Sequence, residues 1–230
     1  MNVLVIDIGG TNVKILATGQ TTPLKFASGK KMTPDLMIAQ IKSLTKKWKY
    51  EAVSIGYPGF VKNGKIQIEP HNLASGWVGF DFKKAFGLPV KIMNDAAMQA
   101  LGSYKTGSLL FLGLGTGLGS TFIVDGMVIP FEVSQLSYKK GTFADYIGNH
   151  GLKRYGKKKW RGHVKVIIER LSAAIHPDQI VIGGGNCRHL NKLPPLCCLG
   201  DNKFAFAGGF RMWEASEKPL KNKTEKNRSA

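Results

Sequence analysis

A short segment near the N-terminus carries residues whose types and spacing suit phosphate chemistry. An apolar run ends at Asp7, a turn passes over Gly9, Gly10 and Thr11, and a second apolar run contains Lys14. Adjacent glycines let a ligand approach the backbone closely, while exposed amides, a hydroxyl and a lysine suit a phosphate. The Asp7 carboxylate would suit Mg²⁺, which prefers hard oxygen ligands. The same pattern is also typical of an ordinary hairpin with a Gly-Gly turn. Other parts of the chain are needed to distinguish a phosphate-binding turn from a purely structural one.

A second glycine turn of the same kind lies near the middle of the chain. Residues 109–124 read as a strand, a glycine-rich turn with Thr116 between Gly115 and Gly117, and another strand. The spacing does not match the dinucleotide-binding fingerprint. Two such hairpins in one chain favour phosphate binding over two unrelated structural turns.

A carboxylate lies between the two turns in the sequence. A strand is expected to end at Met93, and a helix over 94–105 follows with either Asn94 or Asp95 as its cap. A capping role would explain one carboxylate at this place. It would not explain why that carboxylate lies between two turns of the phosphate-binding type.

Four motifs together resemble the ROK sugar kinases, which have the actin/hexokinase-like ATPase fold. They are Asp7-x-Gly-Gly-Thr-x-x-Lys14, the pair Asn94-Asp95, the Leu-Gly-Thr-Gly-Leu-Gly turn and Ile182-Gly-Gly-Gly-Asn186. Segments 72–79, 158–161, 177–186 and 208–214 are similar to the polyphosphate glucokinase subfamily, and the resemblance runs from about residue 3 to residue 214. It implies an α/β fold of the actin/hexokinase-like (ribonuclease H-like) type, with two domains, mixed sheets and an interdomain cleft.

The resemblance implies phosphoryl transfer to the 6-hydroxyl of glucose or a related hexose, with Mg²⁺ as cofactor. Such transfer depends on positioning, electrostatics and one base, which we assign to Asp95. Sugar-binding positions match Asn72, Asn94 and Glu132, together with Asp95 itself. Where the family usually has Glu-x-Gly-His, this chain has Glu-Val-Ser-Gln, so Gln135 replaces a histidine. Glutamine can form hydrogen bonds but cannot titrate, which leaves the sugar preference open.

The resemblance also implies that the phosphates of the phosphoryl donor bind at both glycine turns. Inorganic polyphosphate is the implied donor, and its phosphates are assigned to Thr11, Lys14, Thr116 and Gly117 with the neighbouring glycines 9, 10 and 115. The turn containing Gly183 and Gly184 resembles the element on the adenosine side, so ATP remains a possible donor. The alternative for this third turn is a plain strand-to-helix connection.

The charge of the chain indicates a polyanionic partner. Lys and Arg total 33 against 15 Asp and Glu, a net charge of +18, and residues 214–230 hold only five of the basic residues. In the segment 155–171, where apolar residues recur at helical spacing, Lys157, Arg161 and Lys165 lie at intervals of four residues, which predicts a ridge that could follow a phosphate chain. Solubility charge and a solvated helix face are the alternatives. A nucleic-acid partner is not expected, because no recognised module is present.

Composition favours a globular protein of a reducing compartment. The chain has 230 residues, is 43% hydrophobic, and carries three cysteines (187, 197 and 198) without metal-site spacing. We therefore expect a cytoplasmic protein without zinc, signal peptide or membrane contact, and the family resemblance implies a homodimer. Two alternatives differ in class: a sugar-sensing repressor, which would need a DNA-binding module ahead of residue 3, and a non-enzymatic polyanion-binding protein. An ATP-dependent hexokinase with another sugar preference is the alternative within the enzyme class.

Hydrophobic periodicity and turn residues predict the order of elements. We expect an N-terminal domain over 1–103, a C-terminal domain over 104–214 and a disordered tail over 215–230. The expected strands and hairpins cover 3–18, 23–30, 52–56, 60–69, 89–93, 109–124, the hairpin over Asp125-Gly126, and 180–182. The expected helices cover 33–49, 81–86, 94–105, 142–154, 159–175 and 203–214.

Overall fold

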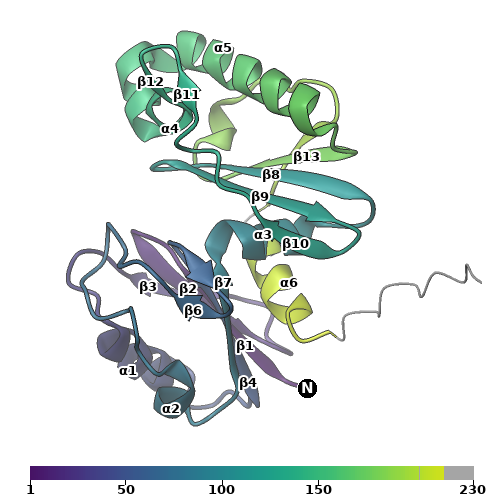
Figure 1. The fold of residues 1–230 in the computed structure, drawn as a ribbon. Coiled ribbons are helices and arrows are strands. Elements are labelled where there is room, and N and C mark those ends of the chain that lie inside the picture. The colour runs from purple at the N-terminus through teal and green to yellow at the C-terminus, as the bar shows by residue number, and fades with distance from the viewer. Residues whose placement is uncertain (202, 215–230) are drawn as a thin grey trace, which may run out of the picture.

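The chain folds into two five-stranded sheets with helices on their faces and between them (Figure 1). The computed structural model describes residues 1–201 and 203–214. The expected disordered tail lies outside the described residues. None of the helices in these two ranges is long and apolar enough to span a bilayer.

The first sheet has the strand order β3-β2-β1-β4-β7. Strand β1 pairs antiparallel with β2 and parallel with β4, and β4 pairs parallel with β7. One face is covered by α1 and α2, whose apolar side chains join those of β1 and β4 in one core cluster. The elements are β1 (Val3–Ile8), β2 (Asn12–Ala17), β3 (Leu24–Ala27), α1 (Pro34–Leu44), β4 (Ala52–Tyr57), β5 (Val61–Lys62), β6 (Lys65–Ile66), α2 (Phe82–Phe86) and β7 (Val90–Asn94).

The second sheet repeats this arrangement with the order β10-β9-β8-β13-β14. Strand β8 pairs antiparallel with β9 and parallel with β13, which in turn is parallel to β14. Helices α4 and α5 cover one face. The elements are β8 (Ser108–Leu114), β9 (Leu118–Val124), β10 (Met127–Pro130), β11 (Ser137–Tyr138), β12 (Gly141–Thr142), α4 (Phe143–Ile147), α5 (Asn149–Ile175), β13 (Gln179–Gly183), the 3-10 helix η1 (Cys187–His189) and β14 (Cys197–Leu199).

Helix α3 (Asp95–Ser103) lies between the two sheets and packs against both (Figure 1). Met98 belongs to the core cluster of the first sheet, whereas Ala96 and Ala100 belong to that of the second. Helix α6 (Lys203–Arg211) crosses α3 so closely that a Cβ at Gly208 would lie 1.7 Å from the Met98 carbonyl oxygen. Small residues in both helices are therefore required by the close packing.

Several expected boundaries are wrong. Helix α1 ends at Leu44 rather than near 49: the backbone of its C-cap, Thr45, leaves helical geometry at ψ 15°, and the Thr45 hydroxyl donates to the Ile41 carbonyl at 2.8 Å. Its buried face contains Met37, Ile38 and Ile41, whereas Leu36 and Leu44 are 56% and 42% exposed. The core therefore contacts the side of α1 that carries Met37, Ile38 and Ile41.

The helices of the second half also differ from the prediction. The expected helix over 142–154 is divided at Gly148 into α4 and the start of α5. The break expected between 154 and 159 is confirmed, because Gly156 within α5 has the non-helical angles φ 68° and ψ 163°. A glycine adopts this positive φ without strain, so α5 consists of two helical stretches that meet at a kink at Gly156. The last helix stops at Arg211 instead of 214. Strands β11, β12 and β14 were not predicted, because two or three residues show no periodicity.

The two-domain division at residues 103 and 104 stays a prediction. The C-terminal helix α6 contacts the first sheet, although it follows the second in sequence. Ser54 on β4 donates a hydrogen bond of 2.6 Å to the Gly209 carbonyl and accepts one of 2.8 Å from the Trp213 indole. The last described segment of the chain therefore ties back to the first half.

Candidate active site

Asp7 and Asp95 lie near each other at the carboxyl ends of the parallel strands of the first sheet. In the sheet register, Asp7 pairs with Gly56, and Gly56 pairs with Met93, two residues before Asp95. A Cβ on Gly56 would lie only 3.5 Å from the Asp95 Cα. Parallel strands bring their ends to one edge of a sheet, which is where ligands bind in open α/β folds.

Burial disfavours ionisation of both carboxyl groups, and the charge of Asp7 disfavours ionisation of Asp95 further. Burial raises the pKa of Asp95 to about 7, and the charge of Asp7 adds to this rise. Burial also raises the pKa of Asp7, opposed by the Lys14 ammonium 3.6 Å from its Oδ2. A base whose pKa lies near 7 is well matched to accepting a proton at neutral pH.

Asn94, and not Asp95, is the N-cap of α3. The Asn94 Oδ1 accepts hydrogen bonds from the N–H groups of Ala96 and Ala97 at 3.0 and 3.2 Å, and its Nδ2 donates to the Gly59 carbonyl at 3.0 Å. Asp95 is the first helical residue, and its Oδ1 accepts from the Ala96 N–H at 2.8 Å. The cap therefore leaves the second oxygen of Asp95 for chemistry. The sugar contact expected of Asn94 stays a prediction, for which one Nδ2 hydrogen remains.

The first glycine turn, between β1 and β2, is held by β3 and its continuation. The Ser28 hydroxyl donates to the Gly9 carbonyl at 2.6 Å, and the Ser28 N–H donates to the Thr11 carbonyl at 3.0 Å. A Cβ at Gly10 would lie 3.3 Å from the Asn72 Cβ. The structure therefore brings Asn72 next to this turn, although the two lie some sixty residues apart in sequence.

The second glycine turn, between β8 and β9, projects exposed residues beside the start of α3. Thr116 and Gly117 are exposed, and no atom lies within 4 Å of a Cβ built on Gly115 or Gly117. A Cβ at Gly119 would lie 3.0 Å from the Ala96 Cβ. This hairpin therefore approaches α3 one residue beyond Asp95.

The third glycine turn packs directly on the second. Gly184 has φ +81°, and a Cβ there would lie 2.3 Å from the Leu114 carbonyl oxygen. Gly183 pairs with Gly113 in the sheet. Two residues that the sequence analysis left unassigned, Asn149 and Asn186, bond to this pair of turns. The asparagine directly after three glycines was the available signal for one of them.

Glu132 and Gln135 lie on a segment fixed to β9. The Val133 N–H donates to the Ser120 hydroxyl at 3.1 Å, one residue from Gly119. Glu132 is exposed, and its Oε1 accepts from the Ser134 N–H at 2.8 Å, while Gln135 donates to the Ser134 hydroxyl at 3.2 Å. Their assignment to the sugar stays a prediction, and the segment lies on the side of the second turn.

The expected basic ridge of α5 is only partly free. Lys157 is exposed, whereas Arg161 is half-buried and donates from Nε to the His189 carbonyl. Lys165 lies 3.7 Å from Glu169. Burial lowers the pKa of His189, and the charges of Lys157, Arg188 and Arg161 lower it further. The cations thus gather around η1, directly after the third glycine turn. Their role toward a phosphate chain stays a prediction.

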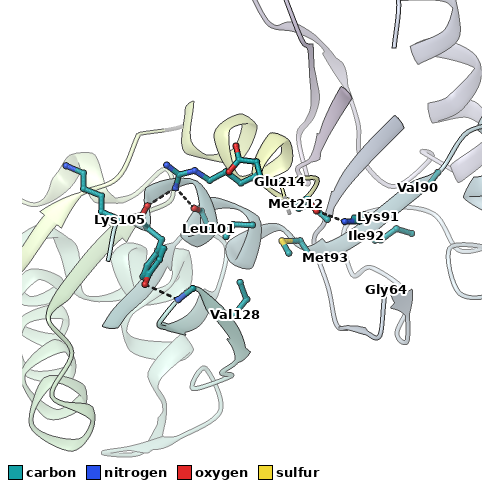
Figure 2. Close-up of a pocket in the computed structure, with 13 residues that line it drawn as sticks. Gly64, Val90, Lys91, Ile92, Met93, Leu101, Lys105, Val128, Met212 and Glu214 are labelled. Atoms are coloured by element: carbon teal, nitrogen blue, oxygen red, sulfur yellow. Dashed lines mark hydrogen bonds between the residues drawn. The ribbon is translucent and has the colours of Figure 1, made fainter. Parts of the chain in front are cut away.

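A pocket of about 940 Å³ lies at the other end of α3 from Asp95 (Figure 2). Its walls come from β7, the end of α3, β10 and the segment after α6, and Leu101, Val128 and Met212 are among its apolar residues. Figure 2 shows Lys91 directed at the Met212 carbonyl, to which it donates at 2.6 Å. None of the site residues predicted from the sequence lines it.

The donor set fits Mg²⁺ only if phosphate oxygens complete it. Among residues 1–201 and 203–214, no three or more His, Cys, Asp or Glu side chains gather as a metal site. Mg²⁺ is commonly held by one or two carboxylates plus substrate phosphates and water. Asp7, next to the first glycine turn, is suited to supply such a carboxylate.

Comparison with known proteins assigns the family. The ROK family profile matches residues 3–130, more than half of the chain. The polyphosphate glucokinase of Mycobacterium tuberculosis is 28% identical over 214 residues, which cover 83% of this chain and 80% of that protein. Among solved structures, the inorganic polyphosphate/ATP-glucomannokinase of Arthrobacter sp. strain KM has a TM-score of 0.76 at 19% identity, covering 90% of this chain and 96% of that one.

A second solved structure is similar over the same length. The ROK family glucokinase of Streptomyces griseus, in complex with glucose and AMPPNP, has a TM-score of 0.68 at 15% identity and covers 92% of this chain and 99% of that one. At these identities the structures show the fold alone. Two sheets of equal strand order with a shared central helix, together with the sequence match, lead to one conclusion: the chain belongs to the ROK family and has the actin/hexokinase-like fold.

Proposed function

We propose that this protein transfers a phosphoryl group from inorganic polyphosphate, or from ATP, to the 6-hydroxyl of glucose or a related hexose. The supporting observation is the position of Asp95, which starts α3 between the strand ends near the first glycine turn and the hairpin of the second. Relatives named polyphosphate glucokinase support the substrate pair.

Each part of the site has a role in this reaction. Asp95 accepts the proton of the sugar 6-hydroxyl. The oxygen of that hydroxyl forms a bond to the terminal phosphorus of the donor, and the bond between this phosphorus and the leaving phosphate oxygen breaks. The glycine turns hold the donor phosphates through backbone amides, with Thr11, Lys14 and Thr116 adding side-chain contacts. Asn72 and Glu132 hold the sugar hydroxyls. Mg²⁺, held by Asp7 and donor oxygens, would neutralise phosphate charge.

Helix α5 favours polyphosphate as the donor. Its first residue, Asn149, donates from the backbone to the Gly115 and Thr116 carbonyls, so the helix begins at the second glycine turn. From 149 to 168 it contains seven Lys or Arg and no acidic residue. A strongly cationic helix leading away from the donor turn suits a long polyanion better than a nucleotide.

Donor and sugar are tested together in one experiment. A coupled assay measures sugar 6-phosphate formed from glucose, mannose or glucosamine with either polyphosphate or ATP. We expect product from polyphosphate and glucose at a higher kcat/KM than from ATP. Product from ATP alone would identify an ATP-dependent hexokinase and remove polyphosphate from the proposal. No product from any pair would favour a non-enzymatic polyanion-binding protein. Binding to polyphosphate and to single-stranded DNA, measured at several salt concentrations, would then test that alternative.

A variant set tests the basic helix. Replacing Lys157, Arg161 and Lys165 by Ala should raise KM for long polyphosphate more than for short chains or ATP, since short donors fill only the catalytic site. Lys47→Ala removes an exposed charge after α1 and serves as the control. Equal losses for all donors would indicate damage to folding or the site, and no loss would leave the ridge a solvated face.

A further inference from the structure

Asn186 connects three segments with one buried side chain. It is 7% exposed and precedes η1, directly after the third glycine turn. Its Nδ2 donates to the Gly115 carbonyl at 3.1 Å and to the Asn149 Oδ1 at 2.9 Å, so both hydrogens of the amide are used. Its backbone N–H donates to the Leu114 carbonyl at 2.9 Å.

The start of α5 completes the same set of contacts. The Asn149 N–H donates to the carbonyls of Gly115 and Thr116 at 3.0 and 3.2 Å. Gly148 allows this approach, because a Cβ there would lie 2.9 Å from the Thr116 carbonyl oxygen and 3.2 Å from the Gly117 Cα. The carbonyls of residues 114, 115 and 116 therefore all face the interior of the molecule.

Because of peptide geometry, these contacts leave backbone N–H groups that point outward and can act as hydrogen-bond donors. In a trans peptide the carbonyl oxygen and the following N–H point to opposite sides. With the carbonyls of Gly115 and Thr116 facing inward, the N–H groups of Thr116 and Gly117 face outward. Within residues 1–201 and 203–214, no backbone hydrogen bond uses either N–H. Successive outward amides in an exposed turn form a concave site for an anion.

We propose that Asn186 is a positioning residue that orients the Thr116 and Gly117 amides toward the donor phosphates. The inference rests on the proposed function and adds a residue to it. A carboxylate at position 186 would keep the size of the side chain but could not donate to the Gly115 carbonyl, whose oxygen it would repel. The peptide between 115 and 116 would then lose its side-chain partner and rotate more freely.

The test uses the Asn186→Asp variant with an Asn191→Asp control. Asn191 is exposed in the segment after η1, so the control adds the same charge to the same region of the chain. We expect Asn186→Asp to raise KM for polyphosphate and ATP about tenfold or more, while the KM for sugar changes less than about twofold. Asn191→Asp should leave all three near their wild-type values. A matching rise in the sugar KM, or an unchanged donor KM, would overturn the proposal.

Amide NMR gives a readout that does not depend on turnover. In the wild type, tripolyphosphate should shift the amide signals of Thr116 and Gly117, and Asn186→Asp should lose these shifts while keeping sugar-induced shifts at Ala96. No shift in the wild type would contradict the donor site itself. Equal shifts in wild type and variant would contradict only the role of Asn186. If Asn186→Asp does not fold, Asn186→Ala removes the donor without adding charge and is expected to act in the same direction.

Discussion

The two glycine turns occupy the same place in two sheets of the same order, yet different parts of the chain hold them. The first turn is held by Ser28, 19 residues from Gly9. The second is held by Asn149 and by Asn186, which lies 71 residues from Gly115. Equal topology therefore does not imply equal support, and the second turn depends on segments that only the folded chain brings together.

The two turns also differ in charge. The strands of the first turn carry Asp7 and Lys14, whose charged atoms lie 3.6 Å apart, and the charge of Asp7 reaches Asp95. The second turn itself offers only amides and the Thr116 hydroxyl. The first turn is thus suited to a metal and to the reacting phosphate, and the second to binding donor oxygens through the backbone.

The largest expected effect belongs to Asp95, which lies between the turns. Asp95→Asn should lower kcat by roughly 10²–10⁴-fold with either donor, because the base is lost while both turns remain. Steady-state kinetics with both donors and calorimetric sugar titration measure this. Activity within a few-fold of wild type, or loss with one donor only, would show that Asp95 is not the common base.

Gly117→Val tests whether the second turn binds by close backbone approach. No atom lies within 4 Å of a Cβ at Gly117, so the fold and Tm should not change. A donor phosphate lying against the turn would meet the new side chain, and donor KM should rise about tenfold or more. Gly126→Val, in the turn of the third hairpin, is unsuitable as a control because its φ is +80°. Gly162→Ala on α5 serves as the control instead, because it adds a side chain in open space away from the turns. An unchanged donor KM in Gly117→Val would remove this turn from the donor site.

Ser28→Ala tests the local support of the first turn. It removes one hydrogen bond to the Gly9 carbonyl but keeps the backbone bond from residue 28 to Thr11. A single neutral hydrogen bond contributes about 1 kcal/mol, so donor KM should rise only about five-fold, less than in Asn186→Asp. Kinetics of the two variants in one preparation series provide the comparison. If Ser28→Ala raised donor KM more than Asn186→Asp, the expected ranking of the two variants would be wrong.

The smallest effect is a stability difference that depends on pH. The folded pKa of Asp95 is raised to about 7, so the contribution of this group to stability is fully present below the unfolded pKa near 3.9 and is lost as pH rises through about 7. Asp95→Asn removes this loss. Its Tm advantage over wild type should therefore grow by a few degrees from pH 5 to pH 8, in chelator-containing buffer. A constant difference across this range would show that Asp95 is not strained in its charged form.

The sequence by itself predicted what local patterns encode. Gly-Gly and Gly-Thr-Gly between apolar runs predicted both hairpins, and β1, β2, β8 and β9 confirm them. Asn94-Asp95 after an apolar strand predicted the start of α3, although not which residue is its cap. The motifs also predicted the ROK family and its fold, because glycines with fixed conformational needs leave a recognisable spacing in a chain.

Only the tertiary structure decided how these pieces support each other. The extent of α1 and the additional break at Gly148 depend on packing, which propensity does not encode. The coupling of Asp7 to Asp95 arises because Gly56 separates two strand ends in space, although the aspartates are far apart in sequence. The same reason applies to the buried amide of Asn186, whose hydrogen-bond partners lie 37 and 71 residues away in sequence. A local sequence pattern does not show which distant carbonyl a side chain will contact in the folded chain.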